Sequence, residues 1–362
     1  MNILTVIGAR PQFIKTGPVS KELRKSNEEI ILHTGQHYDD NMSESFFNEL
    51  KIPEPDYNLF IGSGCHGLQT GKMLIGIEEV LMKEKNDLVL IYGDTNSTIA
   101  GSIAAIKLQI PVAHVESGLR SFNKKMPEEI NRIVTDHLSA ILYTPTNTAV
   151  SNLLNEGINK ERIIRTGDVM YDAFLYAKKK LDIVKVLSKY DLKENEYVLS
   201  TIHRPENTDT KKGLLSLLKG LNGSPKKVII PLHPRTRDYI TKHNLKDEIL
   251  KLENVSLIDP VGYLEFISLE LGAWKIATDS GGIQKEAYLA GKPCITMRKQ
   301  TEWVETVETG WNILVTNDTN KIKDALENFN PKGYRPQFYG DGKAAKQIAN
   351  HINSLEPGKI LL

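Results

Sequence analysis

Short apolar runs alternate with longer amphipathic stretches along most of the 362-residue chain. The runs are rich in β-branched residues and mostly lack polar positions, which is typical of parallel strands covered on both faces. In the first half they lie at 3–7, 30–33, 88–92, 112–115, 141–144 and 163–166. In the second half they lie at 197–202, 227–231, 255–258, 275–278, 294–297 and 312–315. This pattern predicts an α/β protein with two doubly wound parallel sheets.

The alternation occurs twice, and a lysine-rich helical stretch at 171–189 separates the two series. We expect one Rossmann-like domain formed by residues 1–168 and 345–362, and a second one formed by residues 169–344. The final amphipathic stretch, near the C-terminus, is the part expected to return to the first domain. A chain of this length exceeds the usual size of one hydrophobic core, which favours two domains.

The charge balance and the cysteines exclude several functional classes. Lys and Arg total 46 against 45 Asp and Glu, so the chain has no basic surplus for nucleic acid or an anionic membrane. Cys65 and Cys294 lie far apart and form no metal-binding spacing, which argues against a disulfide framework or a zinc site. The first residues read as a strand, not as a signal peptide, and no stretch resembles a membrane span. We therefore expect a cytoplasmic protein without a membrane segment.

A glycine-containing segment at 278–286 (TDSGGIQKE) follows a predicted strand and opens a predicted helix. Gly281 and Gly282 allow a ligand to approach the backbone, and Ser280 precedes the N–H groups with which a helix N-terminus holds phosphate. Glu286 lies one turn into the helix and could accept hydrogen bonds from ribose hydroxyls. The alternative interpretation is an ordinary helix cap with a tight turn.

A second glycine pattern, GSGCHG at 62–67, matches the dinucleotide-binding fingerprint only by spacing. It does not follow the first strand, and no acidic residue ends a second strand about 20 residues later, as that fingerprint requires. We interpret it as a flexible connecting loop.

Basic side chains gather where predicted strands end or on the helix just after one. These are Arg10 and Lys15 in the first half and His203, Arg204, His233 and Arg235 in the second. A lone lysine would be a solvated surface charge, but several cations at corresponding strand ends favour a diphosphate ligand. Ligands of open parallel sheets bind at the carboxyl ends of the strands, so two facing domains would direct both arginines into one cleft.

Carboxylates also end predicted strands. Asp94 and Glu116 follow adjacent apolar runs, and Glu128 lies in the first turn of a predicted helix that begins at Pro127. Three such groups form a plausible acid/base set, although acids in a first helical turn often serve only the helix dipole. The residues alone thus indicate a cleft that binds anions and supports acid/base chemistry.

Together these segments resemble the non-hydrolysing UDP-N-acetylglucosamine 2-epimerases along nearly the whole chain. The matching motifs are 8–11 (GARP) with Lys15, 34–37 (TGQH), 93–95 (GDT), 114–120 (HVESGLR), 127–129 (PEE) followed by 131–132 (NR), 203–204 (HR), 279–282 (DSGG) with Gln284 and Glu286, and 301–302 (TE). Each is weak by itself, and their order and number carry the resemblance.

The resemblance implies the B-type glycosyltransferase fold, with two Rossmann-like domains facing a cleft, in a homodimer. It implies reversible epimerisation at C2 of UDP-N-acetylglucosamine to UDP-N-acetylmannosamine, by elimination and re-addition of UDP through a 2-acetamidoglucal. This chemistry requires a UDP-sugar but no nicotinamide, no metal and no other cofactor.

The resemblance also implies roles for individual residues. Asp94, Glu116 and Glu128 become the acid/base candidates, and His203 joins them beside the diphosphate. The substrate-binding residues implied are Arg10 and Lys15 near the leaving group, Arg204, His233, Ser280, Gly281, Gly282 and Glu286 around phosphate and ribose, and Phe266 by the uracil. Gln36 and His37 match part of a region where bacterial relatives bind a second, activating substrate molecule.

The chain departs from the family pattern at Gln12, Pro205 and Trp303, where many members have Glu, Arg and Arg. These changes leave the substituents at C3 and C6 of the sugar open. The alternatives are a hydrolysing 2-epimerase, a 2-epimerase of a modified UDP-sugar, a glycosyltransferase and a silent nucleotide-sugar sensor. A transferase needs no base at C2, so the three carboxylates favour an epimerase, without identifying which of them is the base.

Overall fold

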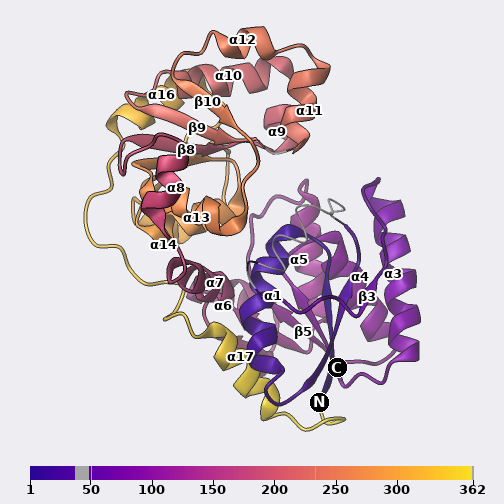
Figure 1. Cartoon of the computed structure of the whole chain (residues 1–362). Helices are drawn as coiled ribbons and strands as arrows, with labels where there is room; N and C mark the ends of the chain where they lie inside the picture. The colour runs from indigo at the N-terminus through magenta and orange to yellow at the C-terminus, as the bar shows by residue number, and fades with distance from the viewer. Residues whose placement is uncertain (37–48, 50, 233, 361–362) are drawn as a thin grey trace. The chain divides into compact units, whose positions relative to one another are not determined.

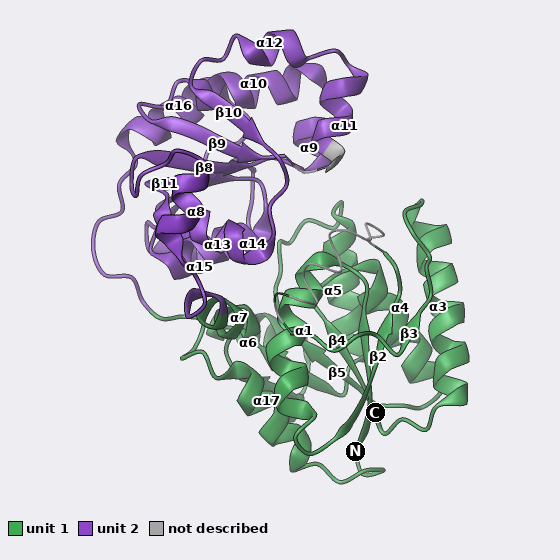
Figure 2. Ribbon diagram, in the orientation of Figure 1, with its two compact units in different colours: residues 1–176, 337–362 green, residues 177–336 purple. Residues whose placement is uncertain are grey.

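The computed structural model describes residues 1–36, 49, 51–232 and 234–360 of the chain (Figure 1). These residues form two compact units, the first from residues 1–176 and 337–362 and the second from residues 177–336 (Figure 2). The chain leaves the first unit within helix α7 (Val169–Lys178) and re-enters it before helix α17 (Ala344–Asn353). The second unit, residues 177–336, is therefore shorter at both ends than the second domain expected from the sequence, residues 169–344.

The first unit contains a seven-stranded parallel sheet in the order β3-β2-β1-β4-β5-β6-β7. Its strands are β1 (Asn2–Ile7), β2 (Glu28–His33), β3 (Tyr57–Asn58), β4 (Leu88–Tyr92), β5 (Val112–Val115), β6 (Ile141–Thr144) and β7 (Ile163–Arg165). All six strands predicted here are present. β3 was missed because its two residues, one exposed and one half-buried, give no apolar run, and it forms only by pairing with Leu32 and His33.

Helices cover both faces of this sheet (Figure 1). They are α1 (Arg10–Leu23), α3 (His66–Lys83), α4 (Asn96–Lys107), α5 (Pro127–Leu138), α6 (Asn147–Asn155), α7 and α17. α17 packs against α1, and the carboxylate of Asp172 in α7 accepts the N–H groups of Ala344 and Ala345 that open α17. Burial raises the pKa of Asp172 to about 6 in spite of these hydrogen bonds.

The expected loop at 62–67 is correct only as far as Cys65, because α3 begins at His66. The stretch after Cys65 buries Gln69, Met73 and Ile77 on one face at helical spacing, and this amphipathic pattern extends the helix into the glycine motif. None of the described helices is long and apolar enough to cross a bilayer.

The second unit contains a six-stranded parallel sheet in the order β10-β9-β8-β11-β12-β13. Its strands are β8 (Tyr197–Thr201), β9 (Lys227–Pro231), β10 (Val255–Ile258), β11 (Lys275–Thr278), β12 (Cys294–Thr296) and β13 (Asn312–Leu314). In each unit the first strand lies between the second and the fourth, so the direction of winding reverses beside it. The predicted fold class, two doubly wound Rossmann-like units, is therefore confirmed.

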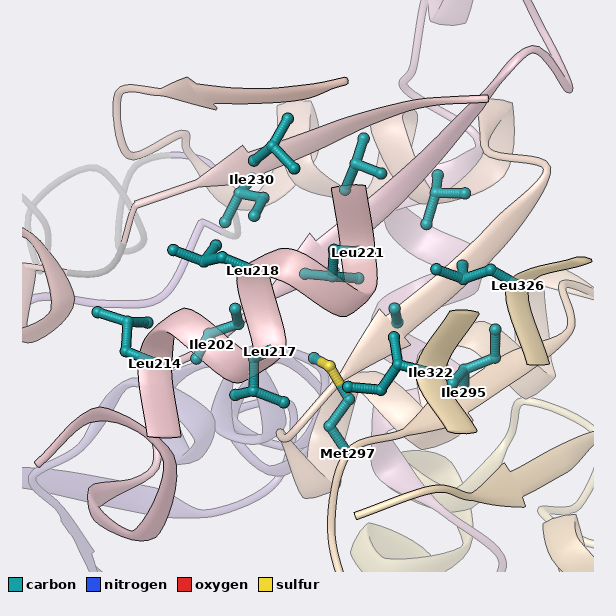
Figure 3. Packing of buried hydrophobic residues seen from close by; sticks show 14 of the residues in the cluster. Ile202, Leu214, Leu217, Leu218, Leu221, Ile230, Ile295, Met297, Ile322 and Leu326 are labelled. Atoms are coloured by element: carbon teal, nitrogen blue, oxygen red, sulfur yellow. The ribbon is translucent and has the colours of Figure 1, made fainter. Parts of the chain in front are cut away.

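The core of the second unit shows how the spacing of apolar residues predicts a helix. α10 (Lys211–Asn222) buries Leu214, Leu217, Leu218 and Leu221, the i, i+3, i+4, i+7 spacing of one helix face (Figure 3). The other helices of this unit are α8 (Ile183–Lys189), α9 (Pro205–Thr208), α11 (Pro234–Lys242), α12 (Lys246–Leu250), α13 (Tyr263–Gly272), α14 (Gly281–Ala290), α15 (Val304–Glu308) and α16 (Thr319–Asn328).

Candidate active site

The turn from β1 into α1, which carries Arg10, is held by the buried side chain of Gln12. Its Oε1 accepts the N–H groups of Gly8 at 2.8 Å and Ala9 at 3.0 Å. Its Nε2 donates to the Tyr92 carbonyl at 3.0 Å and to a hydroxyl of α4 at 3.1 Å. An ionised glutamate at this position could not donate to the Tyr92 carbonyl and would place an oxygen against it. The glutamine that departs from the family pattern therefore makes hydrogen bonds that a glutamate could not make.

Lys15 and Glu116 form an ion pair between α1 and the end of β5. Each side chain is only 8% exposed, so the pair is largely shielded from water. Glu116 has a φ of +72°, a left-handed conformation that costs a residue with a Cβ and persists only where contacts over-determine it. Gly93 lies against both, because a Cβ there would come within 3.0 Å of Lys15 Nζ and 3.3 Å of Glu116 Oε2. The structure thus brings together three segments that the sequence analysis treated separately.

Asp94 follows Gly93 in the turn that leads into α4. Gly93 adopts a left-handed φ of +62°, and Thr95 caps α4 by accepting the Thr98 N–H. Arg132 from α5 binds the Asp94 carboxylate, with Nε at 3.0 Å and Nη2 at 2.8 Å from Oδ2. Arg132 lay within a matching motif but was given no role, since its partner is 38 positions away in sequence.

The two glutamates that open α5 have different surroundings. Glu129 is 1% exposed, accepts the N–H groups of Ser121 and Phe122, and lies 2.5 Å from Arg132 Nη1. Glu128 is half-buried. The sequence could not distinguish the two glutamates. In the structure, Glu129 stabilises the turn at residues 121–122, and Glu128 is the more accessible carboxylate.

Gln36 is tied to the start of α4 and stays a prediction as a regulatory residue. Its Oε1 accepts from the backbone N–H of Ser97 at 3.1 Å and from the Ser97 hydroxyl at 2.8 Å. His37 and His233 lie outside the described residues.

In the second unit, Asp279 organises the turn that carries His203 and Arg204. It is fully buried and accepts the backbone N–H of His203 at 3.1 Å, that of Arg204 at 3.0 Å and Nδ2 of Asn207 at 3.0 Å. His203 Nδ1 lies 3.2 Å from Asp279 Oδ1. Burial alone would raise the pKa of Asp279, but His203 and these hydrogen bonds lower it overall. Asp279 was missed as a site residue, although its place directly after β11 was a usable signal.

The two glycines at the start of α14 have different surroundings. A Cβ on Gly281 would lie 2.2 Å from Glu302 Oε1, whereas a Cβ on Gly282 would meet no atom within 4 Å. Glu302 is itself paired with the buried Arg298, whose Nη2 lies 3.1 Å from Oε2. Gly281 is therefore required by packing, and Gly282 keeps open the space in which an anion could meet the helix N-terminus.

Alanine at these two positions should separate packing from ligand binding. We expect Gly281→Ala to lower the free energy of unfolding by about 1–3 kcal/mol, as over-packing of a well-packed interior does. Gly282→Ala should leave thermal stability nearly unchanged and weaken UDP binding. Calorimetric melting and UDP titration of both variants test this, and equal melting temperatures would contradict the packing argument.

Glu286 and Glu270 form a buried carboxyl pair between α14 and α13. Glu270 is fully buried, and burial together with the nearby Glu286 raises its pKa well above the ordinary value. This shift favours the neutral form of the Glu270 carboxyl group. Phe266 of α13 is 6% exposed and packs in the core with residues such as Leu199 and Ile229, so only its small exposed edge could meet a uracil. Its role beside the uracil stays a prediction.

Trp303, where the family pattern has arginine, is 3% exposed and its ring lies 4.3 Å from the ammonium of Lys285. Lys285 is itself 1% exposed, so an indole face replaces water around this cation. No group of three His, Cys, Asp or Glu side chains among the described residues could hold a metal ion.

Two Rossmann-like units with ionisable residues at their strand ends place the chain in the B-type glycosyltransferase fold class. The sequence matches the UDP-N-acetylglucosamine 2-epimerase family over residues 21–353. The chain belongs to this family and is an isomerase.

Individual relatives agree along nearly their full lengths. A UDP-N-acetylglucosamine 2-epimerase homolog of Methanococcus maripaludis is 55% identical over 98% of this chain and 100% of the relative. The UDP-2,3-diacetamido-2,3-dideoxy-D-glucuronate 2-epimerase of Pseudomonas aeruginosa is 49% identical over 98% and 100%. The crystal structure of the Methanocaldococcus jannaschii UDP-GlcNAc 2-epimerase in complex with UDP-GlcNAc and UDP superposes with a TM-score of 0.91, at 44% identity over 98% of this chain and 99% of that one.

Proposed function

We propose that this protein interconverts UDP-N-acetylglucosamine and UDP-N-acetylmannosamine by elimination and re-addition of UDP. The observation that carries the proposal is the arrangement at the strand ends of the first unit. Arg132 binds Asp94, the residue after Gly93, and Lys15 binds Glu116, whose carboxylate lies against Gly93. Each carboxylate is held by a cation yet stays at the edge where a parallel sheet binds its ligand.

In the proposed reaction, a carboxylate removes the proton at C2 while the C1–oxygen bond to UDP breaks. The C–H electron pair becomes the C1–C2 double bond of a glucal, and the diphosphate takes the bonding electrons of C1–O. UDP then adds back to C1 as a proton reaches the opposite face of C2. Asp94, Glu116 and Glu128 are the groups proposed for these proton transfers.

The remaining predicted residues are proposed to bind the nucleotide. In the first unit, Arg10 and Lys15 would stabilise the charge that develops on the leaving diphosphate. In the second unit, His203 and Arg204 would bind phosphate from their Asp279-anchored turn. The N-terminus of α14 with Ser280, Gly281 and Gly282 would hold phosphate, and Glu286 would hold ribose hydroxyls.

A modified sugar is the second candidate substrate. The Pseudomonas aeruginosa relative named for a diacetamido-glucuronate is 49% identical, and the Methanocaldococcus jannaschii relative named for UDP-N-acetylglucosamine is 46% identical. These identities are too similar to choose between the two sugars. Trp303 and Pro205 also differ from the family pattern. Parallel assays with both UDP-sugars decide which one is turned over with the higher kcat/KM.

We also propose a homodimer that works in the cytoplasm. Leu68, Ile75 and Met82 are 56%, 58% and 66% exposed and lie seven residues apart along α3, which gives the helix an apolar stripe suited to a second copy. Cys65 and Cys294 are both free, in agreement with a reducing compartment.

Exchange with solvent tests the proposed chemistry directly. Incubation with UDP-N-acetylglucosamine in D2O, without added NAD or metal, should give deuterium at C2 of both epimers, because the proposed step breaks that C–H bond. Proton NMR follows the loss of the C2 signal. Epimers that both keep the C2 proton would exclude the elimination, and release of UDP with free N-acetylmannosamine would show a hydrolysing enzyme.

A further inference from the structure

His114 lies in β5, within a motif from which the proposed function uses only Glu116. Its side chain is fully buried. Nδ1 lies 2.7 Å from Oδ1 of Asp136, and Nε2 lies 2.7 Å from the carbonyl oxygen of Gly93. Both ring nitrogens therefore face an oxygen at short hydrogen-bond distance.

Neither of these oxygens can donate. A backbone carbonyl only accepts, and the carboxylate of Asp136 stays ionised because Oδ2 receives Arg120 Nη1 at 2.7 Å and the Gly118 N–H at 3.0 Å. Burial opposes ionisation, yet His114 and Arg120 together lower the pKa of Asp136. Each nitrogen of the His114 ring must then carry a proton for both contacts to form, which makes the ring an imidazolium cation.

The Asp136 carboxylate is the anion that faces His114, and further charged groups surround it. Asp136 on α5 pairs with His114 and Arg120, and Arg120 also binds Glu156 at the end of α6 at 2.6 Å. The Arg162 guanidinium also interacts with the Asp136 charge, and His137 Nε2 lies 3.4 Å from Glu156. The other charges near Gly93 are already paired with one another, Lys15 of α1 with Glu116 and Arg132 of α5 with Asp94.

The hydrogen bond from His114 is one of several that hold the backbone of the turn carrying Asp94. The Tyr92 carbonyl accepts from Gln12 and Thr98 side chains, the Gly93 carbonyl from His114, and the Asp94 carbonyl from Nδ2 of Asn131 at 2.9 Å. Three successive carbonyls are therefore held by side chains from other elements. Of these donors, only His114 is charged.

We propose that His114 is a positioning residue that donates from both ring nitrogens and thereby fixes the Asp94 turn for the reaction at C2. This rests on the proposed function of Asp94. A charged donor forms a shorter and stronger hydrogen bond than a neutral one. A neutral imidazole could donate from only one nitrogen, so either the link to Asp136 or the link to Gly93 would be lost.

The protonation state can be measured without any substrate. The protein labelled with 15N-histidine contains nine histidines, and the His114 signals are assigned from their loss in His114→Gln or by sequential assignment of the unaltered chain. At about pH 8, where an ordinary histidine is neutral, both His114 nitrogens should carry a proton. One protonated and one unprotonated nitrogen in that ring would overturn the proposal.

Kinetics test the positioning role. In His114→Gln, the side-chain amide cannot donate to both Asp136 and the Gly93 carbonyl as the two ring nitrogens do. We expect kcat to fall about ten- to hundredfold while the Kd for UDP is unchanged. The exposed His243→Gln is the matched control and should behave like the unaltered protein. A folded His114→Gln variant with unchanged kcat contradicts the role. Failure of the unaltered protein to exchange the C2 proton counts only against the proposed function, since the NMR result does not depend on it.

Discussion

Replacement of Asp94, Glu116 or Glu128 by its amide is expected to lower turnover about 10²–10⁴-fold, the usual contribution of general acid–base catalysis. This corresponds to about 3–5 kcal/mol of activation free energy. An amide keeps the shape of a carboxylate but cannot exchange a proton. UDP affinity should change little, because the carboxylates are expected to act on the sugar and not on the nucleotide.

The three variants are expected to differ in thermal stability, because their carboxylates take part in different contacts. Glu116→Gln leaves the buried Lys15 without its anion, so a loss of thermal stability should accompany the loss of turnover. Glu128→Gln removes a half-buried carboxylate in the first turn of α5, so we expect a smaller loss of stability than at Glu116, whose side chain is only 8% exposed. Glu161→Gln, at an exposed position, is the control. A variant that turns over like the unaltered protein cannot lack the base, and three such variants would favour a glycosyltransferase.

Asp279→Asn is expected to weaken UDP binding about ten- to hundredfold, the equivalent of about 1.5–3 kcal/mol for hydrogen bonds to a charged group. The amide would turn an N–H donor toward groups that themselves donate, namely the His203 and Arg204 backbones and Asn207. The turn that presents His203 and Arg204 would then lose its anchor.

Isothermal titration with UDP measures this effect, with circular dichroism to confirm that the variant is folded. The exposed Asp324→Asn in α16 of the same unit serves as the control. Unchanged UDP affinity in a folded Asp279→Asn protein would show that the turn does not depend on Asp279, and that His203 and Arg204 take no part in nucleotide binding or are held by other contacts.

Most of the fold could be predicted from the sequence because parallel strands covered on both faces must be apolar along their whole length. All twelve predicted strands are present, and the spacing of Leu214, Leu217, Leu218 and Leu221 identifies a helix by one buried face. β3 escaped prediction because its two residues gain their conformation only by pairing with β2. The start of α3 at His66 escaped because glycine spacing was given more weight than the amphipathic pattern that follows.

The sequence alone also determined where chemistry should gather, since strand ends can be located from the apolar runs that precede them. It could not determine which side chains meet there. Lys15 and Glu116 are 101 positions apart, and Asp94 and Arg132 are 38 positions apart. Such pairs are set by the order of strands in the sheet, which no local pattern encodes.

The same reason explains the remaining differences. Glu128 and Glu129 are identical residues on one helical turn, and only the packing of residues 121–122 commits one of them to structure. His114 reads in sequence as one polar residue in an apolar strand. Its two acceptors come from the turn after β4 and from α5. These elements are distant along the chain and adjacent only in the folded protein, so the tertiary structure decides the protonation of the ring.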